Sequence, residues 1–288
     1  MSQAGTNGHA EAEARRTARR RTPWPLAVVA ALFVIVPFAY WYGTWFGRGL
    51  SDEQVEKYLG ETNNPRHVQH ALSQIAERVE KEGGVAERWL PRVVEAAGSP
   101  FTDVRMTAAW VMGLDHRREE FRAALLRLLE DPEPVVRRNA ALALVRFGDE
   151  RCRPELLAML RPLTVTSDAE GQALTVLSEG TTVKRDTMMA QLRSGERVEE
   201  VRSPLPGRIE KALVKEGDAV ERGRELFRIA PDAAQARDAL IGLAYFGRAE
   251  DLPELERYAA GVEGMAEEVK KQAAATVDAV RRRAKGNP

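Results

Sequence analysis

Residues 179–192 read EGTTVKRDTMMAQL, and residues 216–229 read EGDAVERGRELFRI. The second stretch begins 37 positions after the first (216 − 179), and each has Glu-Gly, a valine four residues after the glutamate and an arginine two residues after that valine. A tandem echo at this period indicates one supersecondary unit that is used twice. Short alternating runs between glycines and prolines surround both copies, which is typical of a small all-β domain. We therefore predict a β domain built from two similar halves.

The second copy carries a more specific signal. Residues 207–223 contain Gly-x-Ile followed by Glu-Gly-Asp-x-Val-x-x-Gly, and this segment resembles the biotinyl/lipoyl type of barrel-sandwich hybrid. The resemblance implies two half-barrels that close on each other. Carrier domains of this type present a modified lysine on the hairpin between the halves, but the corresponding residues 193–198 contain no lysine. No biotin or lipoate is therefore expected. The predicted contact edge of the domain consists of Arg193, Glu196, Arg197, Pro204 and Pro206.

The β half-motif is also similar to that of the periplasmic adaptor proteins of efflux and secretion systems. Those proteins combine it with an N-terminal membrane anchor, and a helical hairpin separates their two half-barrels. Here the connection between the halves is only a few residues long, and the helical patterns flank the β domain instead. An adaptor subunit of an export system is therefore kept as an alternative.

Helical patterns repeat on both sides of the β domain. Three stretches share a Val-basic-x-x-Ala-Ala pattern, and they begin at Val104, Val136 and Val269. Its apolar positions fall on one helix face. A longer pattern, Phe-Gly followed by Pro-Glu-Leu, occurs in residues 147–156 and again in residues 246–255, 99 positions later (246 − 147). The glycine predicts a helix end and the proline predicts the first turn of the next helix.

These helical units resemble HEAT repeats. The residues that carry the resemblance include Asp131-Pro132, Val136-Arg137 and Phe147-Gly148-Asp149, and it covers roughly residues 51–162 and 232–286. HEAT-type stacks are mostly scaffolds that bind proteins on extended surfaces. The basic residues that share one repeat position are candidate partner-binding residues, and they are Arg105, Arg137 and Lys270.

An apolar segment precedes the repeats. Residues 25–46, PLAVVAALFVIVPFAYWYGTWF, carry no charge, and about 20 apolar residues span a bilayer as a helix. A cleaved signal peptide would have a shorter apolar region and a small-residue cleavage site. Arginine excess on the N-terminal side predicts that this end stays in the cytoplasm. The predicted anchor residues are Trp24, Pro25, Pro37, Trp41, Trp45 and Phe46, and the residues that set the topology are Arg15, Arg16, Arg19, Arg20 and Arg21.

The composition excludes some function classes. The 43 basic and 43 acidic residues cancel, which argues against a nucleic-acid partner. The single cysteine, Cys152, excludes an internal disulfide framework. His67 and His70 have the spacing of two metal ligands on one helix face, but no third ligand can be placed near them, so no metal is predicted. No carboxylate pair, nucleophile with its base, or phosphate loop stands out, and the chain is predicted not to be an enzyme.

Together these patterns predict a mainly α chain. It would consist of a basic cytoplasmic tail (1–23), a transmembrane helix (24–47), HEAT-like repeats (51–162), a barrel-sandwich hybrid (163–231) and further repeats (232–286). The expected location is the cytoplasmic (inner) membrane, with a single span and the C-terminal domains outside the cytoplasm. The first functional hypothesis is a scaffold that sits in the lipid bilayer and binds other membrane or periplasmic proteins. The alternatives are the export adaptor and an accessory subunit of a larger membrane complex.

Overall fold

The computed structural model describes residue 28, residues 31–37 and residues 49–286. The chain divides into two compact units, residues 1–49 and residues 50–288, and each is described by itself.

In the first unit the described residues 28 and 31–37 are helical, and Pro37 is among them. The remainder of the predicted span, 24–47, lies outside the described residues, and so do the arginines at 15–21. Where the structure describes the chain, none of its helices combines the length and the apolar character that a membrane crossing requires. This finding contradicts the predicted single-pass location in the inner membrane.

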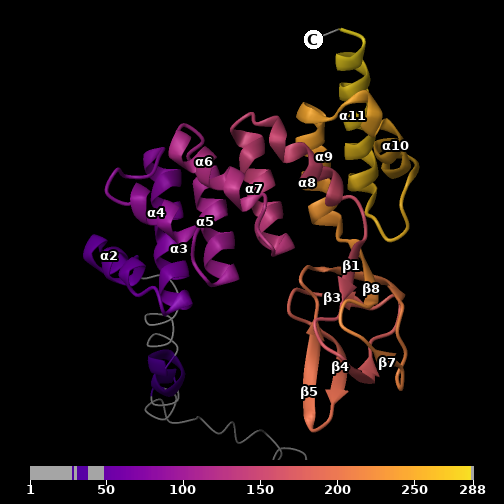
Figure 1. Ribbon diagram of the computed structural model, residues 1–288. Coiled ribbons are helices and arrows are strands. Elements are labelled where there is room, and N and C mark those ends of the chain that lie inside the picture. Colours follow the sequence, from indigo (N-terminus) through magenta and orange to yellow (C-terminus); the bar gives the residue numbers. More distant parts are fainter. Residues whose placement is uncertain (1–27, 29–30, 38–48, 287–288) are drawn as a thin grey trace, which may run out of the picture. The chain divides into compact units, whose positions relative to one another are not determined.

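The second unit contains helices on both sides of a block of strands (Figure 1). The helices before the strands are α2 (Asp52–Gly60), α3 (Pro65–Glu82), α4 (Leu90–Ala96), α5 (Thr102–Leu114), α6 (Glu119–Leu128), α7 (Pro134–Arg146), the 3-10 turn η1 (Glu150–Cys152) and α8 (Arg153–Ala158). Those after the strands are α9 (Ala233–Phe246), the 3-10 turn η2 (Ala249–Asp251), α10 (Leu252–Ala260) and α11 (Glu267–Ala284).

Local sequence signals explain where several of these helices begin and end. Proline is the first residue of α7, and it stands at the second position of α8 and of α10, as Pro154 and Pro253. Proline suits a helix start because its missing N–H would have no partner there. Gly148 follows α7 with a φ of 69°, in the left-handed region that favours glycine after a helix. The predicted helix-turn-helix units at residues 147–156 and 246–255 are thereby confirmed.

The helices form two layers. In one layer α3, α5, α7 and α9 follow one another, and each packs against the next. In the other layer α4 packs against α6, and α8 packs against both α7 and α9. A single hydrophobic core connects the helices on the two sides of the strands, from Val104 and Val136 to Leu240 and Val277. The stack therefore continues across the point where the β domain is inserted.

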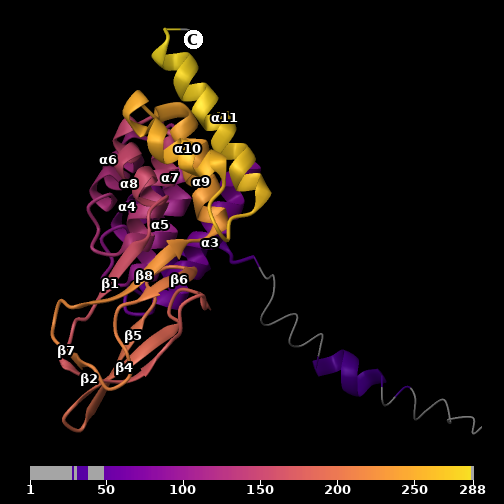
Figure 2. The same cartoon turned by 90° about the vertical axis from the view of Figure 1, so that its right-hand side faces the viewer.

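The strands lie between Leu163 and Pro231. They are β1 (Leu163–Thr166), β2 (Gly171–Val176), β3 (Thr182–Val183), β4 (Met188–Ser194), β5 (Arg197–Arg202), β6 (Gly207–Ala212), β7 (Ala219–Val220) and β8 (Glu225–Pro231). The strand order is β1-β8-β6-β3 in one antiparallel sheet and β5-β4-β2-β7 in the other. Figure 2 shows β1, β8 and β6 close to the helices.

Within residues 163–231 these two sheets remain separate and do not close into a barrel. The prediction of a mainly α chain with an inserted barrel-sandwich hybrid was therefore wrong, and the protein combines helices with two small antiparallel sheets. The edge strands β1 and β5 do not pair with each other. Four of the six residues of β5 are charged, and charged side chains on an edge strand disfavour edge-to-edge pairing with a second copy of the same strand.

The duplicated sequence is nevertheless reflected in the strand order. Exchanging β1 with β5, β2 with β6, β3 with β7 and β4 with β8 converts one sheet order into the other. The repeated Glu-Gly lies in the turns before β3 and β7, where Gly180 and Gly217 have φ values of 83° and 89°. The repeated valines, Val183 and Val220, are both buried in the core of the β domain. One unit is thus used twice, as the echo predicts.

Candidate protein-interaction surfaces

The basic residues predicted to bind partners are engaged mostly inside the helical stack. Arg105 donates from Nε and Nη2 to the two carboxylate oxygens of Asp131, at 2.6 and 3.0 Å. Arg137 donates to the backbone oxygens of Asp131 and Pro132, at 2.7 and 2.9 Å. Lys270, in the third copy of the pattern, is exposed. Two of the three residues therefore hold the loop between α6 and α7.

Buried aspartates at the helix connections complete this pattern, and sequence reasoning missed their role. They are Asp115, Asp131, Asp149 and Asp251. Asp149 accepts from Arg151 at 2.6 Å and from Arg122 at 2.8 Å. The hydrogen bond from Arg151 holds the pKa of Asp149 well below its usual range, burial opposes this shift, and Arg122 reinforces it. The signal was present in the sequence, since each aspartate stands in the loop between two helical patterns.

A groove of about 500 Å³ runs along the layer of α5, α7 and α9. We call it the helical groove, and its lining residues are Trp110, Gly113, Asn139, Leu142, Ala143, Val145, Arg146, Asp238, Ile241 and Gly242. Trp110 is 44% exposed and Ile241 is 39% exposed. Tyr245, 66% exposed, follows Ile241 by one helical turn on the same face of α9. Large apolar side chains from two helices thus face solvent in one groove.

The floor of the helical groove depends on small residues. A Cβ atom on Gly113 would lie 2.8 Å from the Cβ of Ala143, so α5 approaches α7 more closely than two larger residues would allow. A Cβ atom on Gly242 would lie 2.7 Å from Cδ1 of Leu156 and 2.9 Å from Cγ2 of Val145. Close helix packing below, with bulky side chains at the sides, produces the hollow.

The predicted contact edge of the β domain is divided between two environments. Arg193, Glu196 and Arg197 are exposed around the turn between β4 and β5. Pro204 and Pro206 are half-buried in the connection that leads to β6. The hairpin turn is thus accessible, whereas the two prolines shape a loop.

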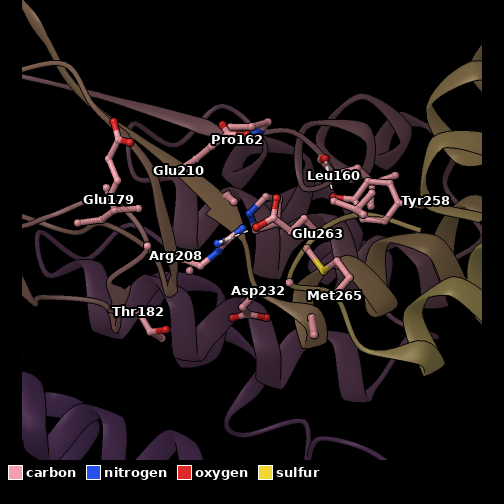
Figure 3. A pocket seen from close by; sticks show the side chains of 18 of the residues that line it. Leu160, Pro162, Glu179, Thr182, Arg208, Glu210, Asp232, Tyr258, Glu263 and Met265 are labelled. Atoms are coloured by element: carbon pink, nitrogen blue, oxygen red, sulfur yellow. Dashed lines mark hydrogen bonds and ion pairs between the residues drawn. The ribbon is translucent and has the colours of Figure 1, made fainter. Parts of the chain in front are cut away.

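A cavity of about 540 Å³ lies where the chain enters and leaves the β domain (Figure 3). Arg208 of β6 and Glu263 of the loop before α11 point toward each other there, at 3.7 Å. The hydroxyl of Tyr258 donates to the backbone oxygen of Leu160 at 2.8 Å. These contacts connect the β domain and its connecting segments to the C-terminal helices. We therefore interpret the cavity as a structural junction.

The residues considered for chemistry are held in structural contacts. The thiol of Cys152 is fully buried, and burial together with the charge of Asp149 raises its pKa to about 12. His67 contacts the carboxylate of Glu61 and stacks on Tyr58, with ring centroids 4.2 Å apart. Among residues 28, 31–37 and 49–286, no group of three possible metal ligands comes together.

The comparisons with known proteins bear on the helical part. A protein-family model described as HEAT repeats matches residues 90–175, which confirms the HEAT resemblance for this part of the chain. A solved structure, described as "Structure and function of a single-chain, multi-domain long-chain acyl-coa carboxylase", is similar at 19% identity. The alignment covers 40% of this chain and 13% of that chain, with a TM-score of 0.24, and a similarity this low carries no argument. No curated protein matches the chain.

Proposed function

We propose that this chain is a non-enzymatic scaffold that binds partner proteins through its helical groove, with the β domain as a second contact surface. The observation that carries the proposal is the exposure of Trp110, Ile241 and Tyr245 along one layer of a HEAT-type stack. HEAT-type stacks present extended surfaces to other proteins.

The composition of the helical groove suits a protein partner. Tryptophan and tyrosine are enriched among the residues that dominate binding energy at protein interfaces. Arg146 and Asp238 also line the groove and can form polar contacts with a partner. A partner side chain that covers Trp110 and Ile241 would remove apolar surface from water, which stabilises the complex by roughly 25 cal/mol per Å².

Two features support a role without catalysis. Cys152 is buried with a raised pKa, which disfavours the thiolate form that a nucleophile needs. His67 is engaged with Glu61 and Tyr58 and does not face the helical groove.

We further propose that the β domain is related to the biotinyl/lipoyl type without its carrier function. The exchange of strand orders between the two halves supports this relation. The hairpin of residues 193–198, which has no lysine, supports the loss of the carrier function. The domain would then contribute binding surface in place of a tethered cofactor.

The test is site-specific photo-cross-linking in the native cells. A photoreactive phenylalanine derivative replaces Trp110 in one variant and Arg127, which is exposed on α6 in the other helical layer, in a matched control. We expect one defined partner protein to be cross-linked from position 110 and not from position 127. The yield should fall when Ile241→Ser and Tyr245→Ser are added, without loss of folding. Equal cross-linking from both positions, or none from position 110, would contradict the proposal.

A further inference from the structure

A second groove lies between the two sheets of the β domain and the start of α7. Its volume is about 550 Å³. We call it the edge groove, and it is lined by residues 132–134, 137, 163–169, 186, 192, 199–202 and 204. It therefore borders both β1 and β5 and does not overlap with the helical groove.

Both strands that border the edge groove are edge strands. Among the described strands β1 has only β8 as a hydrogen-bonded neighbour, and β5 has only β4. Each strand therefore has one side on which no neighbouring strand takes up its backbone N–H and C=O groups. β1 and β5 are also equivalent strands of the two halves, so the groove borders the same edge of each half. An extended peptide can add to such an edge as a further strand.

The charges in the edge groove are predominantly negative. Its lining includes five carboxylates, Glu133, Asp168, Asp186, Glu199 and Glu200, against two guanidinium groups, Arg137 and Arg202.

Both arginines are already engaged. Arg137 donates to backbone oxygens of the loop before α7 and pairs with Glu155. Arg202 donates to the backbone oxygen of Asp186 at 2.6 Å and pairs with Glu200. Within residues 49–286, by contrast, Glu133, Asp168 and Glu199 form no ion pair. Three carboxylates are thus available to an incoming cation.

Glu199 occupies the most informative position. It pairs in register with Leu192 of β4, and it shares a strand face with Val201, which packs on the core of the β domain. A strand added to β5 would bring its own side chains beside Glu199 at cross-strand distance, where an opposite charge is favourable and a like charge is not.

We infer that the edge groove binds an extended, lysine- or arginine-rich segment of a partner protein as an added β-strand. The backbone edges of β1 and β5 provide affinity that does not depend on sequence. Glu133, Asp168 and Glu199 select for positive charge and disfavour an acidic strand. This inference concerns a surface other than the helical groove, and it stands without the function proposed for that groove.

The test uses the full chain and two capped ten-residue peptides, one alternating lysine with valine and one alternating glutamate with valine. Affinity is measured by calorimetry, and protection of the backbone is measured by amide hydrogen exchange. We expect the lysine peptide to bind and to slow exchange in Leu163–Thr166 and Arg197–Arg202. The glutamate peptide should do neither.

Charge-reversal variants locate the site. Glu199→Lys and Asp168→Lys should each weaken binding of the lysine peptide by about tenfold, because a positive charge that repels the peptide replaces a negative charge that attracts it. The matched control is Glu216→Lys, which makes the same change at an exposed turn before β7, outside the groove and at the opposite edge of the sheet from β5, and should leave the affinity unchanged. Trp110→Ser should also leave it unchanged, which separates this test from that of the helical groove.

Several results would overturn the inference. These are the absence of lysine-peptide binding, equal binding of the glutamate peptide, and binding without protection of β1 and β5. A fourth is that β1 and β5 are protected from amide exchange even without peptide, and that this protection disappears when the arginines within residues 15–21 are replaced by glutamine. That result would make the chain's own N-terminal segment the occupant in place of a partner.

Discussion

The guanidinium group of Arg153 contacts both carboxylate oxygens of Asp251, at 2.8 Å from Nε and 2.6 Å from Nη2, although 98 positions separate the two residues in the chain. Arg153 begins α8 before the β domain, and Asp251 ends η2 after it. Arg248 and Glu150 form a second ion pair across the same boundary, at 3.0 Å. The two helical parts are thus joined directly, without help from the strands between them.

The first prediction concerns this pair. Arg153 is 13% exposed and Asp251 is 4% exposed, so Arg153→Ala would leave a buried carboxylate without its main partner. We expect the free energy of unfolding to fall by about 3 kcal/mol, measured by urea denaturation. The control is Arg281→Ala, which removes an exposed pair with Glu256 and should cost less than about 1 kcal/mol. Equal effects of the two substitutions would contradict the role of Arg153.

The second prediction concerns pH. Hydrogen bonds from Arg151 and Arg122 lower the pKa of Asp149 in the folded chain below its unfolded value of about 3.9. A lowered pKa stabilises the folded state above the unfolded pKa, and the contribution is lost as pH falls toward the folded pKa. We therefore expect the free energy of unfolding to decline below about pH 4. Asp149→Asn should be less stable than the parent at neutral pH, and its stability should decline less steeply as pH falls.

A second buried carboxylate acts in the opposite direction. Burial raises the pKa of Glu155, although Arg137 and Arg138 oppose this shift. Its contribution is present at low pH and is lost as pH rises through the folded pKa. Urea denaturation of the parent protein and of Asp149→Asn across the same pH series isolates the contribution of Asp149 to the pH dependence of stability. Parallel pH profiles of the two proteins would refute the assignment.

The third prediction concerns Cys152. Because burial raises the pKa of its thiol to about 12, we expect almost no reaction with a disulfide reagent at pH 8 in the folded protein. In guanidinium chloride the same thiol should react fully, and the rate at intermediate denaturant should follow global unfolding. Rapid modification under native conditions would show that the segment from η1 to α8 opens independently.

The fourth prediction concerns the packing below the helical groove. Alanine normally stabilises a helix relative to glycine by about 1 kcal/mol, but at Gly242 its Cβ would be within 3 Å of Leu156 and Val145. We expect Gly242→Ala to destabilise the protein by about 1–2 kcal/mol in thermal or urea unfolding. Gly60→Ala in α2 is the control, because the nearest atom there is the side-chain Nη2 of Arg92, at 3.4 Å. A stabilised Gly242→Ala variant would show that α9 can move away from α7 and α8.

The periodic parts of the chain were predictable because a repeated sequence must repeat its local geometry. The echo at 37 residues predicted two equivalent β halves, and the Phe-Gly and Pro-Glu-Leu pattern predicted the helix connections at Gly148 and Pro154. That the two sheets remain separate and do not close into a barrel was not predictable in this way. It depends on whether β1 and β5 meet, and that depends on charges and on neighbouring elements such as the start of α7.

The candidate surfaces were predicted only in part. Because Arg105 and Arg137 share one position in the repeat, the sequence indicated that they have the same role. It could not show that both contact the loop at Asp131 and not another protein. The exposure of Trp110 was missed, since a tryptophan in a helical pattern is ordinarily assigned to the core. Which face of α5 remains uncovered is set by the helices that pack against it, chiefly α3 and α7.

The pairing of Leu163 with Ile229 places the first and last strands of the β domain next to each other. The stretch between them therefore leaves and rejoins the helical stack at almost the same point. Such a stretch behaves as a cassette, which evolution can insert, exchange or remove while the surrounding helices keep their contacts. In a stack that lacked this stretch, the ion pair of Arg153 and Asp251 would join the two helical parts as it does in the present protein.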